Sequence, residues 1–352
     1  MAEITSTYYS TSRLRIHALQ KGDLSGNNTV IFIHGNASSS VFWEEIMLNL
    51  PDEIHAIAPD LRGYGKTEDK IIDATRGFSD QAEDIIALLG ELNVEKIHVA
   101  GHSMGGGVIY QLMTEIPEKL ASVTLINPVS PYGFGGTKNE TGTPIWEDFA
   151  GTGGGVANPE FARRIKEKDT TEEDPNASPR VVMNAFYWKP PFRSENEEVL
   201  LEGVLEQKIG EKKYPGDSES SENWPFMKPG KFGPVNAASP KYLQGLAEKI
   251  IHSNPKPPVL WIRGSDDLIV SDESLFDMNT LGKMGLIPDY PGEEICPPQP
   301  MIAQTRYVLK RYEEEGGKTE EVVMKNTGHS PYIEQPEIFM KHFLNLINGR
   351  KS

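Results

Sequence analysis

The chain has 352 residues, 38% hydrophobic and 24% charged, so it is long enough for one large domain or two and has an ordinary globular composition. Acidic residues outnumber basic ones by 51 to 35, and the resulting formal charge of −16 argues against nucleic acid or an anionic membrane as a partner. With one cysteine, no apolar run of membrane-spanning length and no signal-peptide pattern, we expect a cytoplasmic protein without disulfides.

The first third of the chain alternates between short β-rich runs and amphipathic helical stretches. The β-rich runs are residues 13–19, 29–33, 55–58, 96–100 and 122–126. The run TVIFI, residues 29–33, is typical of a strand buried on both faces. Apolar residues at helical spacing predict helices over 79–92 and 104–116. Alternation of this kind predicts a parallel sheet covered by helices.

The middle of the chain, residues 131–255, breaks this alternation. It is rich in Gly, Pro, aromatic and charged residues, with helical patches at 159–168, 178–188 and 195–209. We interpret it as a mainly helical cap, in which the aromatic residues form the cap's own core or line an apolar chamber above the site. The stretch GTGGG, residues 151–155, is consistent with a mobile lid or with a flexible surface loop.

Sheet patterning returns after the cap. Residues 258–262 and 321–324 predict two more strands, and residues 336–347 predict a final helix that begins at a proline. The sequence therefore predicts an α/β fold, a mostly parallel sheet flanked by helices, built from residues 1–130 and 256–352 with the cap inserted between them. A second, smaller insertion is expected from about residue 274 to 300.

The stretch GHSMG, residues 101–105, matches the pattern G-x-S-x-G and lies between a predicted strand and a predicted helix. Its glycines leave room for a sharp turn that lifts the Ser103 hydroxyl above the sheet. The helix that begins at Met104 directs its positive end toward any negative charge that forms there. The setting, more than the short pattern, indicates a nucleophile.

A serine hydroxyl needs a base, and His329 lies on a loop after the last predicted strand, where α/β sheets build their sites. His98 and His102 are four residues apart but span a strand and a turn, so we expect no metal site there. A carboxylate should follow the penultimate strand, and both Asp266 and Asp267 are available. The order Ser, Asp, His is the one expected for this fold.

Five segments resemble the α/β-hydrolase fold enzymes, in the capped branch that includes esterases, haloperoxidase-like enzymes, epoxide hydrolases and haloalkane dehalogenases. They are FIHGN (32–36), PDLRGYG (59–65), GHSMG (101–105), GSDD (264–267) and GH (328–329), in the family's order along nearly the whole chain outside the insertions.

The resemblance implies a role for each matching residue. Ser103 would be the nucleophile, His329 the base and Asp267, the fourth residue of G-x-x-D, the acid that orients the base, with Asp266 as a rival. The backbone N–H groups of Asn36 and Met104 would form the oxyanion hole, each typically contributing about 3–4 kcal/mol to the transition state.

Two departures restrict the chemistry. Dehalogenases and epoxide hydrolases of this branch carry an aspartate where this chain has Ser103, which argues against both reactions. The loop HGNASSS, residues 34–40, followed by Trp43, resembles the dehalogenase loop and not the HGGG-type loop of many lipases. A serine nucleophile suits an ester, thioester, amide, lactone or activated carbon–carbon bond.

We therefore expect a serine hydrolase that cleaves a small-molecule carboxylic ester with an apolar portion, without a metal or organic cofactor. The alternatives are a carbon–carbon bond or lactone hydrolase with the same triad, a perhydrolase, and a ligand-binding receptor on this fold. The oligomeric state stays open.

The stretch GKT, residues 65–67, resembles the end of a phosphate-binding loop, but the required first glycine falls on Asp60, so no nucleotide site is expected. Cys296 has no neighbouring base and is expected to be inert.

Overall fold

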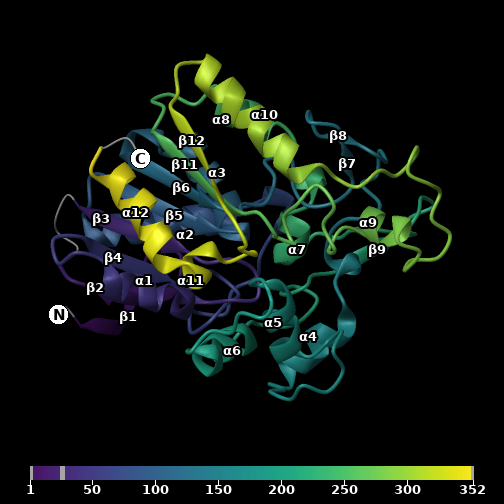
Figure 1. Ribbon diagram of the computed structural model, residues 1–352, viewed down its shortest axis with the longest axis horizontal. Helices are drawn as coiled ribbons and strands as arrows, with labels where there is room; N and C mark the ends of the chain where they lie inside the picture. Colours follow the sequence, from purple (N-terminus) through teal and green to yellow (C-terminus); the bar gives the residue numbers. More distant parts are fainter. Residues whose placement is uncertain (1–2, 24–27, 350–352) are drawn as a thin grey trace.

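An eight-stranded sheet forms the centre of the molecule (Figure 1) in a computed structural model that describes residues 3–23 and 28–349. Its strand order is β1-β2-β4-β3-β5-β6-β11-β12. The strands are β1 (Ile4–Ser10), β2 (Arg15–Lys21), β3 (Thr29–Ile33), β4 (His55–Pro59), β5 (Ile97–His102), β6 (Leu120–Ile126), β11 (Val259–Gly264) and β12 (Thr319–Met324). β2 pairs antiparallel with β1 and β4, and the pairs from β4 to β12 are parallel.

Helices cover both faces of the sheet, which confirms the predicted fold class (Figure 1). One face carries α2 (Ser79–Leu92), α3 (Met104–Glu115), α8 (Leu246–Ile251) and α10 (Met301–Glu314). The other carries α1 (Glu44–Asn49), α11 (Pro331–Glu334) and α12 (Pro336–Ile347). In the part of the chain that the structure describes, no helix is both long and apolar enough to cross a bilayer.

Local sequence explains most of these elements. All five residues of β3 are buried, as expected for a continuous apolar strand between two others. α2 ends where Asn93 adopts a left-handed conformation, with φ of 53°, and α12 begins with Pro336 in its first turn. The predicted strands and helices of the core are confirmed, with ends shifted by one or two residues in most cases.

The sequence did not reveal β1, α1 or α10. β1 is an edge strand whose residues are all half-buried or exposed, so it lacks a long apolar run. α10 turns a partly polar face toward the protein interior, where Gln304 and Thr305 are buried. Apolar periodicity alone therefore does not predict β1 or α10.

The predicted helical patches of the middle region form α4 (Pro159–Lys166), α5 (Pro179–Phe186) and α6 (Glu197–Leu205), which we call the cap helices. They lie together on one side of the sheet in Figure 1. Phe161, Val182 and Leu201 from these helices share one apolar cluster with Phe42 of the main domain. The cap helices are thus packed onto the core and have no separate centre.

An outer lobe, residues 137–156, 218–229 and 274–300, projects to one side (Figure 1). It contains β7 (Thr137–Lys138), β8 (Thr143–Pro144), β9 (Ser218–Ser220), β10 (Met227–Pro229) and α9 (Met278–Lys283). Trp146 and Trp224 pack there with Met278 and Cys296. The two insertions predicted separately from the sequence therefore share one small apolar cluster.

Two expectations about the middle region need correction. Residues 151–155 do not form an exposed surface loop, since residues 151–154 are buried. The N–H of Gly154 donates to Oδ1 of Asn236 at 2.8 Å, and the hydroxyls of Thr152 and Ser239 are 2.7 Å apart. Glycine at Gly153 is needed because a Cβ would lie 2.3 Å from that same Oδ1.

The second correction concerns the predicted end of the cap at residue 255. α8 lies within the region assigned to the cap, yet it packs against α3 and α10 on the main sheet. Leu246, Ile250 and Ile251 belong to the core cluster on that face. The core therefore resumes before residue 256, while α7 (Pro234–Ala237) lies in the connection that leads back to it.

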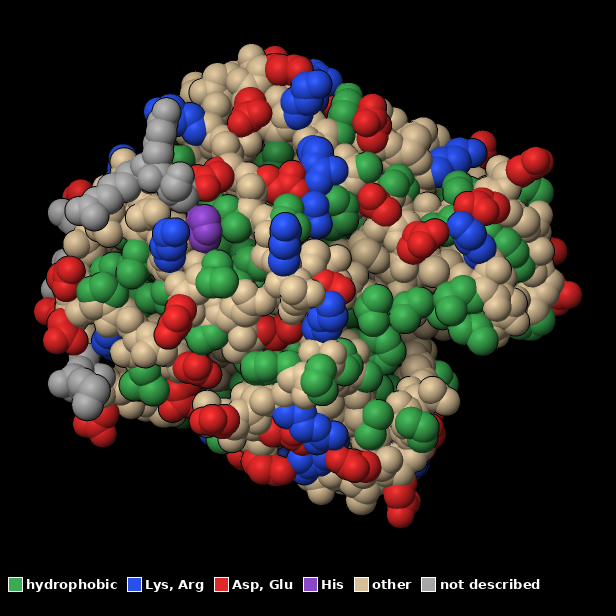
Figure 2. Space-filling view, viewed as in Figure 1, with side chains coloured by type: hydrophobic (Ala, Val, Ile, Leu, Met, Phe, Trp, Pro, Cys, Tyr) green, Lys and Arg blue, Asp and Glu red, His purple; other side chains and the backbone are tan. Residues whose placement is uncertain are grey.

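Figure 2 shows charged side chains of both signs spread over the visible face of the molecule.

Candidate active site

Ser103 stands at the sharp turn between β5 and α3. Its φ and ψ are 55° and −118°, a region that non-glycine residues rarely adopt. The backbone is held there on both sides: the Ser103 N–H donates to the carbonyl of Ile126 at 2.9 Å, and the Ser103 carbonyl accepts from Gly106 at 2.9 Å and Val129 at 3.1 Å. Strain of this kind persists only where the surroundings fix it, and it clusters at functional sites.

The glycines around Ser103 are required by close backbone packing. A Cβ on Gly105 would lie 2.4 Å from the carbonyl oxygen of Ile33, and one on Gly101 would lie 2.7 Å from the carbonyl oxygen of Gly105. A Cβ on Gly35 would lie 3.0 Å from the Cβ of Ser103. Both glycines of the G-x-S-x-G pattern are therefore needed because a side chain at either position would collide with nearby backbone.

We expect Gly105→Ala to lower the free energy of unfolding by about 1–3 kcal/mol, because the new methyl group meets backbone that cannot rotate away. Gly90→Ala is the matched control. Gly90 is exposed in α2, and a Cβ there meets nothing within 4 Å, so alanine should raise stability by about 0.5–1 kcal/mol. Urea unfolding of the three proteins measures both effects, and equal midpoints would contradict the tight packing of the turn.

His329 and Asp267 form a buried pair at the carboxyl ends of β12 and β11. The Nδ1 of His329 lies 2.8 Å from Oδ2 of Asp267, and both side chains are almost fully inaccessible. The second carboxylate oxygen, Oδ1, accepts the N–H groups of Ile269 at 2.8 Å and Val270 at 3.1 Å. The carboxylate is therefore fixed on both oxygens and can hold the imidazole in one orientation.

Asp266, the rival carboxylate, has other partners. Its Oδ1 accepts from the Lys189 ammonium at 2.7 Å and its Oδ2 accepts from the Ser265 hydroxyl at 2.6 Å. The side chain is about one third exposed, and the bond from Lys189 holds the pKa of Asp266 below its ordinary value. Asp267, not Asp266, is the residue that the structure brings against His329.

His102 connects this pair to the turn that carries Ser103. Its Nε2–H donates to the carbonyl of His329 at 2.7 Å, and the two rings lie 4.6 Å apart between centroids. Burial and the neighbouring His329 lower the pKa of His102 well below its ordinary value, so the ring is neutral. The loop of His329 is thus held against the residue that precedes Ser103.

Asn127 fastens three strand ends near the site. Its Nδ2 donates to the carbonyls of His329 at 2.7 Å and Gly328 at 3.2 Å, and its Oδ1 accepts the N–H of Gly264 at 3.1 Å. Gly328 and His329 come after β12, Gly264 is the last residue of β11, and Asn127 comes directly after β6. One side-chain amide therefore joins the segments that carry the histidine and aspartate.

The two predicted oxyanion donors lie next to one another in the fold. Asn36 follows β3, and Met104 is the first residue of α3, where backbone N–H groups have no partner within the helix. The Tyr64 hydroxyl donates to Oδ1 of Asn36 at 2.8 Å and to the sulfur of Met104 at 3.4 Å. One hydroxyl thus contacts the side chains of both residues.

A group of buried polar side chains surrounds Asn36, and no pattern in the sequence indicated it. The Tyr187 hydroxyl donates to the carbonyl of Ala37 at 2.8 Å, and Nε2 of Gln207 donates to Oδ1 of Asn36 at 3.1 Å. The amide oxygen of Gln207 is buried and has no partner within the described chain. Tyr214 is also buried, and burial raises its pKa, opposed by a hydrogen bond from Asn36. We call Asn36, Tyr64, Tyr187, Gln207 and Tyr214 the polar cluster.

The stretch GKT, residues 65–67, has a structural role. The N–H of Lys66 donates to the Asp60 carboxylate at 2.8 Å, and the N–H of Ser40 donates to it at 2.7 Å. Burial opposes ionisation of Asp60, but hydrogen bonds from His17, Lys66 and Ser40 lower its pKa to about 2. The turn is therefore organised around a buried carboxylate, which would repel a phosphate.

The two remaining candidates lie in the interior. The Nδ1 of His98 is 2.7 Å from the hydroxyl of Ser122 on the neighbouring strand, and burial lowers the pKa of His98 to about 4. Cys296 is buried in the outer lobe, and burial raises the pKa of its thiol to about 11. A thiol with that pKa is protonated at neutral pH, so it is a poor nucleophile.

Comparison with known proteins is consistent with this geometry. The family model described as the alpha/beta hydrolase fold matches residues 28–290. Among solved structures, a serine hydrolase from Cycloclasticus zankles aligns with a TM-score of 0.62 at 16% identity, covering 99% of each chain. The 2-hydroxy-6-oxo-6-phenylhexa-2,4-dienoate hydrolase of Rhodococcus sp. strain RHA1 aligns with a TM-score of 0.59 at 18% identity, covering 99% of this chain and all of the other.

Sequence relatives match a shorter region. A dihydrolipoyllysine-residue acetyltransferase component of an acetoin cleaving system from Cupriavidus necator is 35% identical over 126 residues, 36% of this chain and 32% of the relative. A 2-hydroxy-6-oxo-6-phenylhexa-2,4-dienoate hydrolase from Burkholderia cepacia is 28% identical over 129 residues, 36% of this chain and 44% of the relative. The chain therefore matches less than half the length of these curated relatives.

Proposed function

The chain belongs to the α/β hydrolase fold family, and from that premise we propose that it is a serine hydrolase that cleaves a carboxylic ester with an apolar portion. The proposal is supported by the strained turn at Ser103, by the buried His329–Asp267 pair, and by the hydrogen bond from His102, the neighbour of Ser103, to the carbonyl of His329. Ser103 is half-buried, whereas His329 and Asp267 are buried. We also propose a small-molecule substrate and a cytoplasmic location.

The reaction would proceed in two steps. With its Nδ1–H donated to Asp267, His329 presents Nε2 as the base that takes the Ser103 proton as Oγ attacks the ester carbonyl. The N–H groups of Asn36 and Met104 would stabilise the oxyanion. The leaving alcohol takes the proton from His329. Water then attacks the acyl-enzyme as His329 takes its proton, and His329 returns that proton to Ser103 Oγ as the bond to the acyl group breaks and the acid is released.

The experiment that tests this proposal is hydrolysis of 4-nitrophenyl esters from acetate to laurate by the wild-type protein. An acyl-enzyme mechanism predicts a burst of nitrophenol equal to the enzyme concentration when deacylation is slower than acylation. Saturable turnover would support the proposal. Ligand binding without turnover of any ester, thioester or lactone would instead support the receptor alternative.

A carbon–carbon bond hydrolase is the second candidate, and the polar cluster favours it. Relatives named as dienoate hydrolases from Burkholderia cepacia and Comamonas testosteroni match part of the chain. The amide nitrogen of Gln207 donates to the side chain of Asn36, whose backbone N–H is a predicted oxyanion donor, and the amide oxygen of Gln207 has no partner within the described chain. It could accept a bond from the enol hydroxyl of such a substrate, and an orphaned buried acceptor is costly without a ligand or water.

We expect Gln207→Leu to separate the two candidates. If the physiological bond is carbon–carbon, kcat/KM for 2-hydroxy-6-oxo-6-phenylhexa-2,4-dienoate should fall about 10-fold more than kcat/KM for 4-nitrophenyl butyrate, because the enol loses its acceptor. Gln244→Leu, at an exposed position, is the control. If wild type does not consume the dienoate, or if the two substrates respond equally, the second candidate is wrong.

A further inference from the structure

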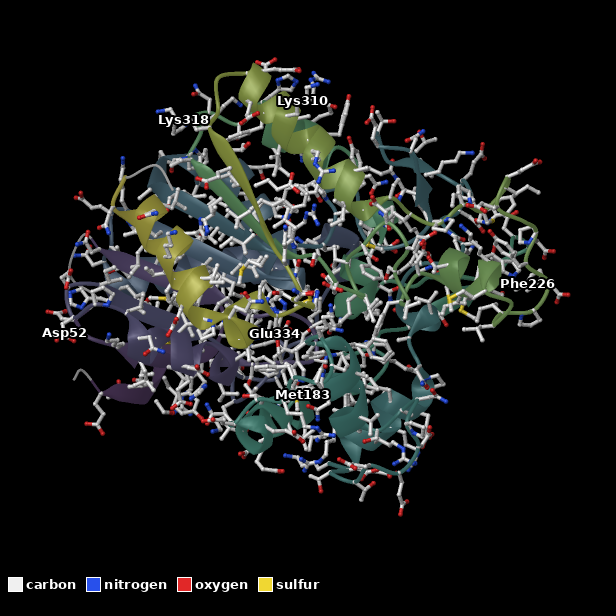
Figure 3. All side chains as sticks on the ribbon, viewed as in Figure 1. Asp52, Met183, Phe226, Lys310, Lys318 and Glu334 are labelled. Atoms are coloured by element: carbon white, nitrogen blue, oxygen red, sulfur yellow. The ribbon has the colours of Figure 1, made fainter. Side chains whose placement is uncertain are left out.

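The carboxylate of Glu334 joins two segments that are far apart in the sequence. Its Oε1 accepts the N–H of Gly328 at 2.7 Å, and its Oε2 accepts the N–H of Lys189 at 2.9 Å. Gly328 immediately precedes His329, and Lys189 follows cap helix α5. Figure 3 shows Glu334 at the junction between α11 and the cap helices, near Met183 of α5.

The two joined segments are also in direct contact. A Cβ on Gly328 would lie 2.7 Å from the backbone nitrogen of Lys189 and 2.7 Å from the carbonyl carbon of Trp188. The Lys189 ammonium lies 2.7 Å from Oδ1 of Asp266, the neighbour of Asp267. The segment after α5 therefore touches both loops that carry the predicted base and acid.

We propose that Glu334 is a positioning residue that fastens the His329 loop to the cap helices, so that the triad is aligned while the segment after α5 is in place. The inference rests on the proposed function, because it concerns the same site. A carboxylate that accepts two N–H groups makes stronger hydrogen bonds than a neutral acceptor. Loss of either bond would release the backbone next to His329 or the backbone of the cap.

The bridge should depend on pH. Burial raises the pKa of Glu334 to about 7, and the negative charges of Asp267 and Asp266 act in the same direction, against the bonds from Lys189 and Gly328. The charged or titratable groups on the adjoining elements include His329, paired with Asp267, and the Lys189 ammonium, paired with Asp266. They also include Tyr332 of α11, Glu337 of α12 and His102, which contacts His329. Protonation turns one acceptor oxygen into a hydroxyl, so one N–H loses its partner. The bridge is complete above about pH 7 and weakens as the pH falls through that value.

Amide hydrogen exchange tests the bridge without relying on activity. In Glu334→Gln, the amide oxygen can accept only one of the two N–H groups while the amide nitrogen faces the other, so exchange at pH 8 should accelerate about 10-fold at either Lys189 or Gly328. Glu337→Gln, at an exposed position three residues later, should leave both amides unchanged. Acceleration at neither amide would overturn the bridge.

Ester hydrolysis tests the positioning role. The ratio of wild-type to Glu334→Gln kcat/KM should be about 10 at pH 8.5 and should approach 1 at pH 5.5, where Glu334 is protonated in the wild type. The same ratio for Glu337→Gln should stay near 1 throughout. A pH-independent ratio for Glu334→Gln, or an unchanged activity despite faster exchange, would contradict the positioning role.

Two further outcomes are decisive. If Glu334→Gln does not fold, the wild type alone suffices: protection of at least one of the Lys189 and Gly328 amides, corrected for intrinsic exchange, should rise between pH 6 and pH 8, and pH-independent protection of both would refute the bridge. If the wild type hydrolyses no ester while both amides behave as expected, the proposed function fails and the bridge stands.

Discussion

Ser103→Ala is expected to lower kcat/KM for a 4-nitrophenyl ester by about 10⁴- to 10⁶-fold, the largest effect of any single substitution in this chain. The reason is that alanine removes the atom that would form the proposed acyl-enzyme while the turn itself remains. Alanine keeps the Cβ that the surroundings already accommodate at φ of 55°, so the fold should survive. Circular dichroism provides that control.

Intact mass after treatment with a fluorophosphonate gives a second measure of the same substitution. Wild type should gain one adduct as fluoride leaves phosphorus and Ser103 Oγ takes its place, and Ser103→Ala should gain none. An adduct on both proteins would assign the reactivity to another side chain. No adduct on folded wild type, even with a smaller probe, would mean that Ser103 is not activated.

Asp267→Asn is expected to lower kcat/KM by about 10⁴-fold. The asparagine would replace an oxygen that accepts from His329, so the imidazole would be held in the wrong tautomer or released. Asp266→Asn is the matched control because it makes the same chemical change at the adjacent residue, which is bound to Lys189. We expect less than about a 3-fold loss for this control.

Steady-state kinetics at pH 8 distinguish these two substitutions, with urea unfolding to compare their stability. A large loss for Asp266→Asn and a small one for Asp267→Asn would reverse the assignment of the acid. Equal losses would mean that the Lys189–Asp266 ion pair is as important for the site as the buried carboxylate. The first result would contradict the role of Asp267 as the residue that orients His329, and the second would contradict the expectation that Asp266 has little effect.

Features encoded within short stretches of sequence were predictable. The turn at Ser103 needs a strand, two glycines and a helix in succession, and residues 97–115 contain them all. β3 and α12 were likewise evident. A strand buried on both faces gives a continuous apolar run, as in β3, and a helix buried on one face gives apolar residues at helical spacing, as in α12. The resemblance to a known family added the roles of Asp267, Asn36 and Met104, for which spacing alone left alternatives.

Features that depend on contact between distant segments were not predictable. Nothing near Gln207 indicates that it lies against Asn36, 171 residues away, and nothing near Glu334 indicates Lys189, 145 residues away. Composition misled in one case: the glycines at 151–155 suggested mobility, whereas Gly153 allows close packing against Asn236. A glycine-rich stretch permits both flexibility and tight contact, and its neighbours decide between them.

The partners of the Asn127 side chain come late in the order of synthesis. Gly264, Gly328 and His329 follow Asn127 by 137, 201 and 202 residues. A nascent chain that ends before β12 contains Ser103 but lacks His329. The bonds from Asn127 to the His329 loop can therefore form only after β12 has been synthesised, and hydrolysis that needs both residues should begin only then.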